Sequence, residues 1–185
     1  MIQLVTIYVV VIFAALVFLF FAFVAILRGI IGREAPFIRS PWTAVNVLEN
    51  FLDLDLNSVF CDLGCGDGRV MRTFYERFPE AQYVGIEKNF LPYLAFNIRN
   101  RDIIGKNFSV IRADIFRRDL STATHIFVYL FPPMMGKLEA KLERELKRGA
   151  VVISLDFPLL NKKPKEIVKF YDKSRQERLI YVYEF

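Results

Sequence analysis

Residues 59–69 read V-F-C-D-L-G-C-G-D-G-R, an apolar run that closes on an acidic residue and opens into a glycine-rich turn. Cys65 and Asp67 separate the three glycines of this turn, and a helical pattern follows at once. Because glycine has no side chain, a ligand can lie against the bare backbone N–H groups, and the N-terminus of the next helix adds a partial positive charge. The stretch therefore predicts a buried strand, a ligand-binding turn and a helix.

The acidic character of the turn narrows the choice of ligand. Asp62 and Asp67 would repel a pyrophosphate, whereas they suit a ligand that carries cations, such as the ammonium and sulfonium groups of S-adenosylmethionine. A dinucleotide-binding turn is the rival interpretation, and its glycines follow the spacing G-x-G-x-x-G. In this chain the third glycine comes one residue early, and Arg69 stands where the dinucleotide pattern has glycine. The turn therefore favours S-adenosylmethionine over a nicotinamide or flavin dinucleotide.

The rest of the chain alternates between apolar runs and helical repeats. Five runs predict buried parallel strands, at residues 58–63, 82–87, 108–112, 124–130 and 150–155. The last two runs, 166–171 and 178–185, leave no room for a helix between them and predict an antiparallel hairpin at the sheet edge. This order predicts an α/β fold, a doubly wound Rossmann-like sheet of seven strands that ends in the hairpin.

Helical repeats occupy the segments between the runs. One of them places Leu91, Leu94, Ala95 and Ile98 at the i, i+3, i+4 and i+7 positions of a helix, and such an apolar stripe normally faces the core. Ahead of the first strand, Ser40 and Pro41 predict the N-cap and first residue of a further helix. The sole histidine, His125, begins a predicted strand, and we expect it to be structural.

Acidic residues close three of the predicted strands, where ligands sit in sheets of this kind. Glu87 follows Gly68 by 19 residues and can accept hydrogen bonds from both hydroxyls of a ribose. Asp114 can accept a hydrogen bond from the exocyclic amine of adenine while Ile115 covers the base. Ordinary helix N-caps are the rival interpretation for both carboxylates. The recurrence at Asp62, Glu87 and Asp114 favours a nucleoside site.

At this point the chain resembles the seven-strand, S-adenosylmethionine-dependent methyltransferases, in which D-L-G-C-G-D-G is the glycine loop. More narrowly, it is similar to a small membrane-anchored branch that includes mitochondrial protein-lysine methyltransferases and prokaryotic relatives. Residues 36–41, P-F-I-R-S-P, and residues 62–69 correspond to its P-F/Y-V-P-S/T-P and D-L-G-S-G-D-G-R motifs. Arg39 stands in place of a proline of that pattern, and Cys65 in place of a serine.

The resemblance implies a methyltransferase domain at residues 41–185 that uses S-adenosyl-L-methionine and no metal, since the sulfonium already activates the methyl group. The implied cofactor-binding residues are Phe37, Asp62, Gly64, Cys65, Gly66, Asp67, Gly68, Glu87, Lys88, Asp114, Ile115 and Tyr129. The implied substrate channel contains Tyr129, Phe131 and Pro132. Two cysteines, Cys61 and Cys65, are too few for a structural zinc site and are interpreted as small buried residues.

The residue before Pro132-Pro133 differs between methyltransferases that act on different classes of substrate. Methyltransferases that act on nucleic-acid or glutamine amines place Asn or Asp there, whereas Phe131 cannot accept a hydrogen bond, which argues against nucleic acid. An aromatic channel suits the aliphatic amine of lysine. We therefore expect methylation of a lysine side chain in a membrane protein. The alternatives are a methyltransferase for a lipid or other apolar small molecule, and a non-catalytic cofactor-binding membrane module.

Residues 1–27 carry no charged side chain. As a helix this stretch would measure about 40 Å, more than the roughly 30 Å of a bilayer core. A cleaved signal peptide is the rival interpretation, but it would need a basic start, a shorter apolar core and a small-residue cleavage site. We expect a transmembrane anchor at residues 1–28 that contacts membrane lipids, followed by a juxtamembrane linker at residues 29–40.

Basic residues follow the apolar stretch. Arg28, Arg33 and Arg39 lie after it, whereas no basic side chain precedes it. Positive-inside bias therefore predicts a single-pass membrane protein with its catalytic domain on the cytoplasmic side. The formal net charge of +5 is modest and compatible with a surface of anionic lipids.

Overall fold

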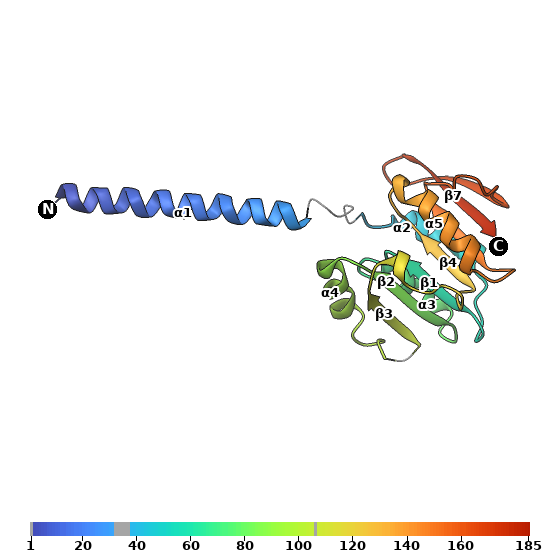
Figure 1. Cartoon of the computed structure of the whole chain (residues 1–185). Coiled ribbons are helices and arrows are strands. Elements are labelled where there is room, and N and C mark those ends of the chain that lie inside the picture. Colours follow the sequence, from blue (N-terminus) through green and yellow to red (C-terminus); the bar gives the residue numbers. More distant parts are fainter. Residues whose placement is uncertain (1, 32–37, 106) are drawn as a thin grey trace. The chain divides into compact units, whose positions relative to one another are not determined.

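The computed structural model describes residues 2–31, 38–105 and 107–185 and divides the chain into two compact units, Met1–Pro36 and Phe37–Phe185 (Figure 1). The first unit contains one helix, α1 (Ile2–Ile31), of 30 residues. Large apolar side chains described in α1 are exposed, Phe18 to 73 %. Of the helices in the described ranges, none combines the length and apolarity needed to cross a membrane. The expected anchor is thus confirmed as a helix but not as a membrane span.

The second unit is built on a seven-stranded sheet of order β3-β2-β1-β4-β5-β7-β6. Its strands are β1 (Val59–Leu63), β2 (Gln82–Glu87), β3 (Phe108–Arg112), β4 (His125–Val128), β5 (Val151–Leu155), β6 (Glu166–Tyr171) and β7 (Glu177–Glu184). The first five pair in parallel, and β7 runs antiparallel between β5 and β6. The predicted α/β sheet and its terminal hairpin are confirmed.

Helices cover both faces of the sheet. One face packs against α2 (Trp42–Leu48), α3 (Arg69–Arg77) and α4 (Phe90–Arg99), and the other packs against α5 (Pro132–Glu145) and the short helix η2 (Ile115–Arg117). Aromatic rings dominate the first interface, where Phe60 lies 5.5 Å from Phe74 and 5.7 Å from Tyr83, ring centre to ring centre. This packing fixes the glycine-rich turn between β1 and α3.

The expected N-cap of α2 was wrong by one residue. The helix begins at Trp42, and Pro41, with φ −60° and ψ 143°, has the extended backbone of the cap residue. The backbone carbonyl of Ser40 instead accepts a hydrogen bond from Arg69 Nη1 at 3.1 Å. Ser40 is therefore held against the glycine-rich turn.

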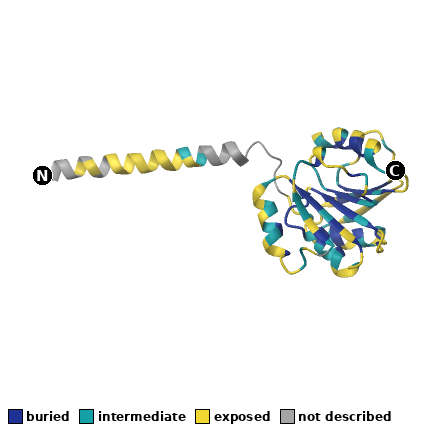
Figure 2. Cartoon of the chain, turned by 60° about the horizontal axis from the view of Figure 1, so that its bottom comes forward, coloured by how far each residue is buried: buried dark blue, intermediate teal, exposed yellow. Residues whose placement is uncertain are grey.

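The expected orientation of α4 was also wrong. Leu91, Leu94 and Ile98 are exposed, whereas Phe96 is the buried residue of this helix. In Figure 2 most of the sheet has the dark blue of buried residues, and the helices that cover it also carry exposed residues in yellow. Phe96 stacks on Phe108 of β3, with ring centres 5.5 Å apart and planes at 22°. Because this ring pair occupies the contact with the sheet, the aliphatic stripe faces outward.

A buried carboxylate on α5 secures the connection between β5 and β6. Glu139 is 1 % exposed and accepts hydrogen bonds from the backbone N–H groups of Leu160 at 2.8 Å, Asn161 at 3.0 Å and Lys162 at 2.6 Å. We expect Glu139→Ala to lower the free energy of unfolding by about 3 kcal/mol, because three amides lose a charged acceptor. Urea unfolding against the exposed Glu143→Ala control measures the difference, and equal midpoints would contradict this role.

Candidate active site

The carboxyl ends of four parallel strands meet at one edge of the sheet. Leu63 of β1 pairs with Ile86 of β2 and with Val128 of β4, so these three strands end nearly level. Glu87 of β2 in turn pairs with Arg112 of β3. This edge carries four of the predicted site residues: Asp62, Glu87, Asp114 and Tyr129.

The glycine-rich turn folds over the end of β2. The N–H groups of Gly64 and Cys65 donate to the carbonyl of Ile86 at 2.8 and 3.2 Å. Gly68 forms the N-cap of α3 with φ +77°, and a Cβ there would lie 2.5 Å from the Phe96 ring. The left-handed backbone conformation and the close approach of the Phe96 ring both require glycine at position 68.

Glu87 ties this turn to the segment that follows β2. It is 6 % exposed. Its Oε2 accepts a hydrogen bond from Gly66 N at 3.0 Å, and its Oε1 accepts one from Asn89 N at 2.8 Å. The carboxylate stands where the sequence predicted a ribose ligand, and it also sets the position of the loop.

Asp62 is a buried carboxylate that faces the site. It is 3 % exposed, and within the described part of the chain no hydrogen-bond donor reaches it. Burial first, and then the negative charges of Glu87 and Asp67, raise the pKa of Asp62 well above its usual range. A cationic ligand would relieve this electrostatic cost.

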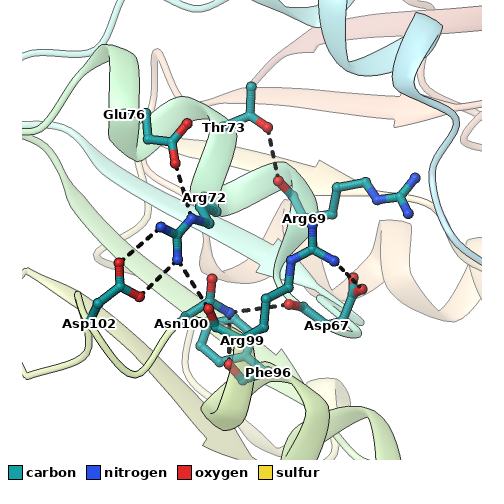
Figure 3. A network of polar contacts seen from close by, with 9 residues as sticks. All are labelled: Asp67, Arg69, Arg72, Thr73, Glu76, Phe96, Arg99, Asn100 and Asp102. Carbon is teal, nitrogen blue, oxygen red and sulfur yellow. Dashed lines mark hydrogen bonds and ion pairs between the residues drawn. The ribbon is translucent and has the colours of Figure 1, made fainter.

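Asp67 differs from Asp62 because arginines balance its charge. Its Oδ2 lies 3.1 Å from Arg99 Nη1 and 3.2 Å from Arg39 Nη2. Figure 3 shows Arg99 pointing at this carboxylate while Asn100 Nδ2 donates to the backbone carbonyl of Asp67 at 3.2 Å. Asp67 is thus held by two arginines, so it does not present the free charge on which the sequence argument relied.

The residues after β2 and β3 pair with each other. Lys88 Nζ lies 3.8 Å from Asp114 Oδ2, and Asp114 Oδ1 accepts a hydrogen bond from Phe116 N at 3.0 Å. Asp114 therefore caps η2, as the rival interpretation proposed, and one of its oxygens remains beside Lys88. Ile115 is buried in the core under the site.

A small cleft, open to solvent, lies over the ends of β1 and β4. Five predicted residues line it: Asp62, Gly64, Cys65, Asp67 and Tyr129. The other wall comes from Ile38, Arg39, Ser40 and Arg69, which the sequence argument had not assigned to the site. Gly66, Gly68, Glu87, Lys88, Asp114 and Ile115 are not lining residues, and Phe37 lies outside the described residues.

Tyr129 is held by a charged cluster from β5 and β7. Arg178 Nη2 donates to the Tyr129 hydroxyl at 2.9 Å, and Arg178 Nε donates to Asp156 Oδ1 at 3.0 Å. The Tyr129 ring stacks on Phe157 with centres 6.3 Å apart. Burial raises the pKa of Tyr129 despite the opposing charge of Arg178. Asp156 closes β5 as Asp62 closes β1, and that strand-end signal could have identified it.

The rest of the predicted channel lies nearer the surface. Phe131 is 47 % exposed and forms the N-cap of α5, and Pro132 is the first residue of that helix. Neither is among the residues that line the cleft. The structure thus brings Tyr129 to the site and leaves Phe131 and Pro132 at its approach.

Comparison with known proteins assigns the family. The model of the ANTKMT methyltransferase domain matches residues 62–166, more than half of the chain. The chain belongs to this methyltransferase family. The methyltransferase is 30 % identical to a protein-lysine N-methyltransferase of Saccharolobus islandicus, in a match that covers 81 % of this chain and 93 % of the relative.

More distant relatives extend the comparison. The methyltransferase is 31 % identical to a Xenopus laevis lysine N-methyltransferase of an ATP synthase subunit, over 71 % of its own length, but spans only 58 % of that relative. An RNA methyltransferase of Salinibacter ruber, solved with S-adenosyl-L-homocysteine, superposes with a TM-score of 0.71 at 26 % identity, covering 80 % of this chain and 93 % of that one. The enzyme is an S-adenosylmethionine-dependent methyltransferase with the seven-stranded class I sheet.

The surroundings of the two cysteines and the histidine of this methyltransferase fit structural roles rather than catalytic ones. Burial raises the pKa of Cys61 to about 12 and raises that of Cys65 as well, so both free thiols stay protonated at neutral pH. His125 Nδ1 lies 2.9 Å from Thr124 Oγ1 at the start of β4, and burial lowers its pKa. The start of β4 is the end away from the cleft, so His125 is remote from the site.

Proposed function

We propose that this methyltransferase transfers the methyl group of S-adenosylmethionine to a lysine side chain of a protein and that α1 holds the enzyme at a membrane. The observation that carries the choice of substrate is Phe131, which stands in place of an amide or carboxylate before Pro132-Pro133 and cannot accept a hydrogen bond. The ring of Tyr129, which stacks on Phe157, adds an aromatic surface to the cleft. The names of two relatives support the same choice of substrate, since both relatives are lysine methyltransferases.

The residues around the cleft fit the cofactor. When bound, S-adenosylmethionine supplies a methyl group already activated on a sulfonium. Asp62 is a buried carboxylate that lines the cleft and receives no hydrogen bond from the described residues, which fits the cofactor's amino group. Arg69 Nε is buried without a hydrogen-bond partner in the described ranges, which fits its carboxylate. In this proposal Glu87 receives the ribose hydroxyls and Asp114 the adenine amine, with Ile115 beneath the base.

Where the substrate amine would bind, the protein positions the amine and does not supply a general base. Because the pKa of Tyr129 is raised, its phenol stays protonated at neutral pH and acts only as a hydrogen-bonding group. A lysine ammonium has an ordinary pKa of about 10.4, and an aromatic channel that removes water favours its neutral form. Alignment of the amine with the methyl group then lowers the barrier.

Tyr129→Phe tests the hydroxyl that Arg178 holds. The ring and its stacking on Phe157 remain, while one hydrogen bond is lost, so we expect kcat/KM for the protein substrate to fall roughly 10-fold. The KM for S-adenosylmethionine should stay within about two-fold. Tyr171→Phe, at an exposed tyrosine on β6, is the matched control. A Tyr129→Phe enzyme with unchanged kinetics would remove the hydroxyl from the mechanism.

Membrane attachment is the second half of the proposal. It is supported by the uncharged residues 1–27 and by the exposed apolar side chains described in α1. Arg28, Arg33 and Arg39 favour a cytoplasmic domain in a single-pass arrangement. Extraction of native membranes with alkaline carbonate should leave the protein in the pellet, and recovery in the supernatant would refute the anchor.

The substrate class is tested with methyl-labelled S-adenosylmethionine and membranes from a strain that lacks the enzyme. After addition of the purified full-length enzyme, label is counted separately in protein and lipid extracts. Label in a discrete protein band, recovered as methyl-lysine after hydrolysis, is the expected result. Label in the lipid extract would assign a small-molecule substrate, and binding of cofactor without any transfer would indicate a non-catalytic module.

A further inference from the structure

The outer side of α4 presents a row of large apolar residues. Phe90, Leu91, Leu94 and Ile98, here called the α4 face, are 53, 66, 42 and 65 % exposed. At about 100° per residue, these four positions fall within an arc of roughly 100°. A contiguous exposed apolar surface of this kind marks an interaction site more often than isolated apolar residues do.

The helix that carries this face is firmly seated. Phe96 is fully buried against Phe108. Asn100, at the end of α4, donates from Nδ2 to the carbonyl of Phe96 at 2.8 Å and to that of Asp67 at 3.2 Å. The exposure of the α4 face is therefore a property of the folded domain, and its position is fixed relative to the glycine-rich turn.

Basic side chains border the α4 face. The guanidinium carbon of Arg112 lies 5.1 Å from the centre of the Phe90 ring. Arg101 follows the end of α4, and the neighbouring acid, Asp102, is bound by Arg72 through two hydrogen bonds of 2.9 Å. In the part of the chain that the structure describes, neither Arg101 nor Arg112 forms a salt bridge. An apolar row with arginines at its border is complementary to a surface of acyl chains and anionic headgroups.

We propose that the α4 face docks the catalytic domain on an anionic lipid bilayer. The inference rests on the proposed membrane attachment, because α1 is what would bring the domain to the bilayer. The seven residues from 32 to 38 span at most about 25 Å even when fully extended. Since α4 begins directly after the carboxyl end of β2, docking through Phe90 and Leu91 brings the edge of the sheet that bears the site close to the headgroups.

A fluorescent label on the α4 face tests the proposal. Full-length Leu94→Cys, labelled with the environment-sensitive dye NBD, is placed in nanodiscs of phosphatidylcholine and phosphatidylglycerol, one protein in each. Both native thiols are buried and their raised pKa values keep them protonated, so the label reacts with the new cysteine. We expect blue-shifted emission that lipid-borne doxyl groups quench at least two-fold, and weaker quenching in phosphatidylcholine alone. Ile167→Cys is the matched control, 56 % exposed on β6 at the opposite edge of the sheet.

A label on α1 separates failure of docking from failure of attachment. Phe18→Cys should be quenched whenever α1 enters the bilayer. Quenching at position 18 without quenching at position 94 would overturn the docking proposal and leave attachment standing. Quenching at neither position would refute both. Blue-shifted emission at position 94 that doxyl lipids do not quench would show that protein covers the α4 face, and would also overturn the proposal.

Discussion

Replacing Asp62 with asparagine should stabilise the ligand-free methyltransferase and weaken its binding of S-adenosylmethionine. The carboxylate is buried, no donor reaches it among the residues that the structure describes, and its pKa is raised by burial and by the neighbouring charges of Glu87 and Asp67. Asparagine removes the buried charge, so the free energy of unfolding should increase. The same change removes the group we assign to the cofactor's ammonium, and we expect affinity to fall roughly 10- to 100-fold.

The pH dependence of this effect has a definite sign. A group whose pKa is raised by folding contributes stability below its unfolded pKa, about 3.9 for aspartate, and loses that contribution as pH rises through the raised value. The thermal midpoint of Asp62→Asn should therefore exceed that of wild type at neutral pH, and the gap should narrow toward pH 4. Thermal unfolding without ligand and calorimetric titration with S-adenosylhomocysteine measure the two effects.

Asp102→Asn provides the contrasting control. Hydrogen bonding to Arg72 lowers the pKa of this exposed aspartate, so its contribution to stability is present above the unfolded pKa and is lost as pH falls. Its replacement should lower the midpoint at neutral pH without altering cofactor binding. If Asp62→Asn also lowered the midpoint while binding cofactor normally, the assignment of Asp62 would be wrong.

Glu87→Ala should reduce methyl transfer at least 100-fold. Gly66 N and Asn89 N would both lose their acceptor, and the proposed ligand of the ribose hydroxyls would be gone. Two charge-assisted hydrogen bonds at about 1.5–3 kcal/mol each account for a loss of this size. Steady-state kinetics with labelled S-adenosylmethionine give kcat and KM.

Glu87→Gln separates the loss of charge from the loss of the contacts. It keeps one acceptor oxygen, and we expect it to retain more activity than Glu87→Ala. Circular dichroism of both variants should match wild type, since the sheet does not depend on the loop. Normal turnover by a folded Glu87→Ala enzyme would exclude Glu87 from the cofactor site.

Much of the fold could be predicted because the runs that form parallel strands are apolar almost throughout. The sheet edge could be predicted as well, since residues 166–171 and 178–185 left no space for a crossover helix. The side of α4 that meets the sheet could not be predicted from the sequence. Periodicity shows that Leu91, Leu94 and Ile98 share a face, but the ring pair of Phe96 and Phe108 decides which face is buried, and that contact joins distant parts of the sequence.

The candidate site could likewise be predicted only in part. Asp62 and Glu87 were found because each closes a strand beside the glycine turn. The arginines that balance Asp67 were missed, since Arg39 and Arg99 lie 28 and 32 residues away in the sequence and meet it only in the folded chain. Arg178 reaches Tyr129 because β7 lies beside β5, which depends on the order of strands.

The burial of Asp62 links the stability of this enzyme to the supply of S-adenosylmethionine. A ligand that binds only the folded state stabilises it by RT ln(1 + [L]/Kd). In the ligand-free protein, burial beside the negative charges of Glu87 and Asp67 makes ionisation of Asp62 costly, so the unfolded fraction rises when S-adenosylmethionine is scarce. Proteases that clear unfolded chains then remove more of the enzyme. The abundance of the methyltransferase should therefore follow the concentration of its own methyl donor, without any dedicated regulator.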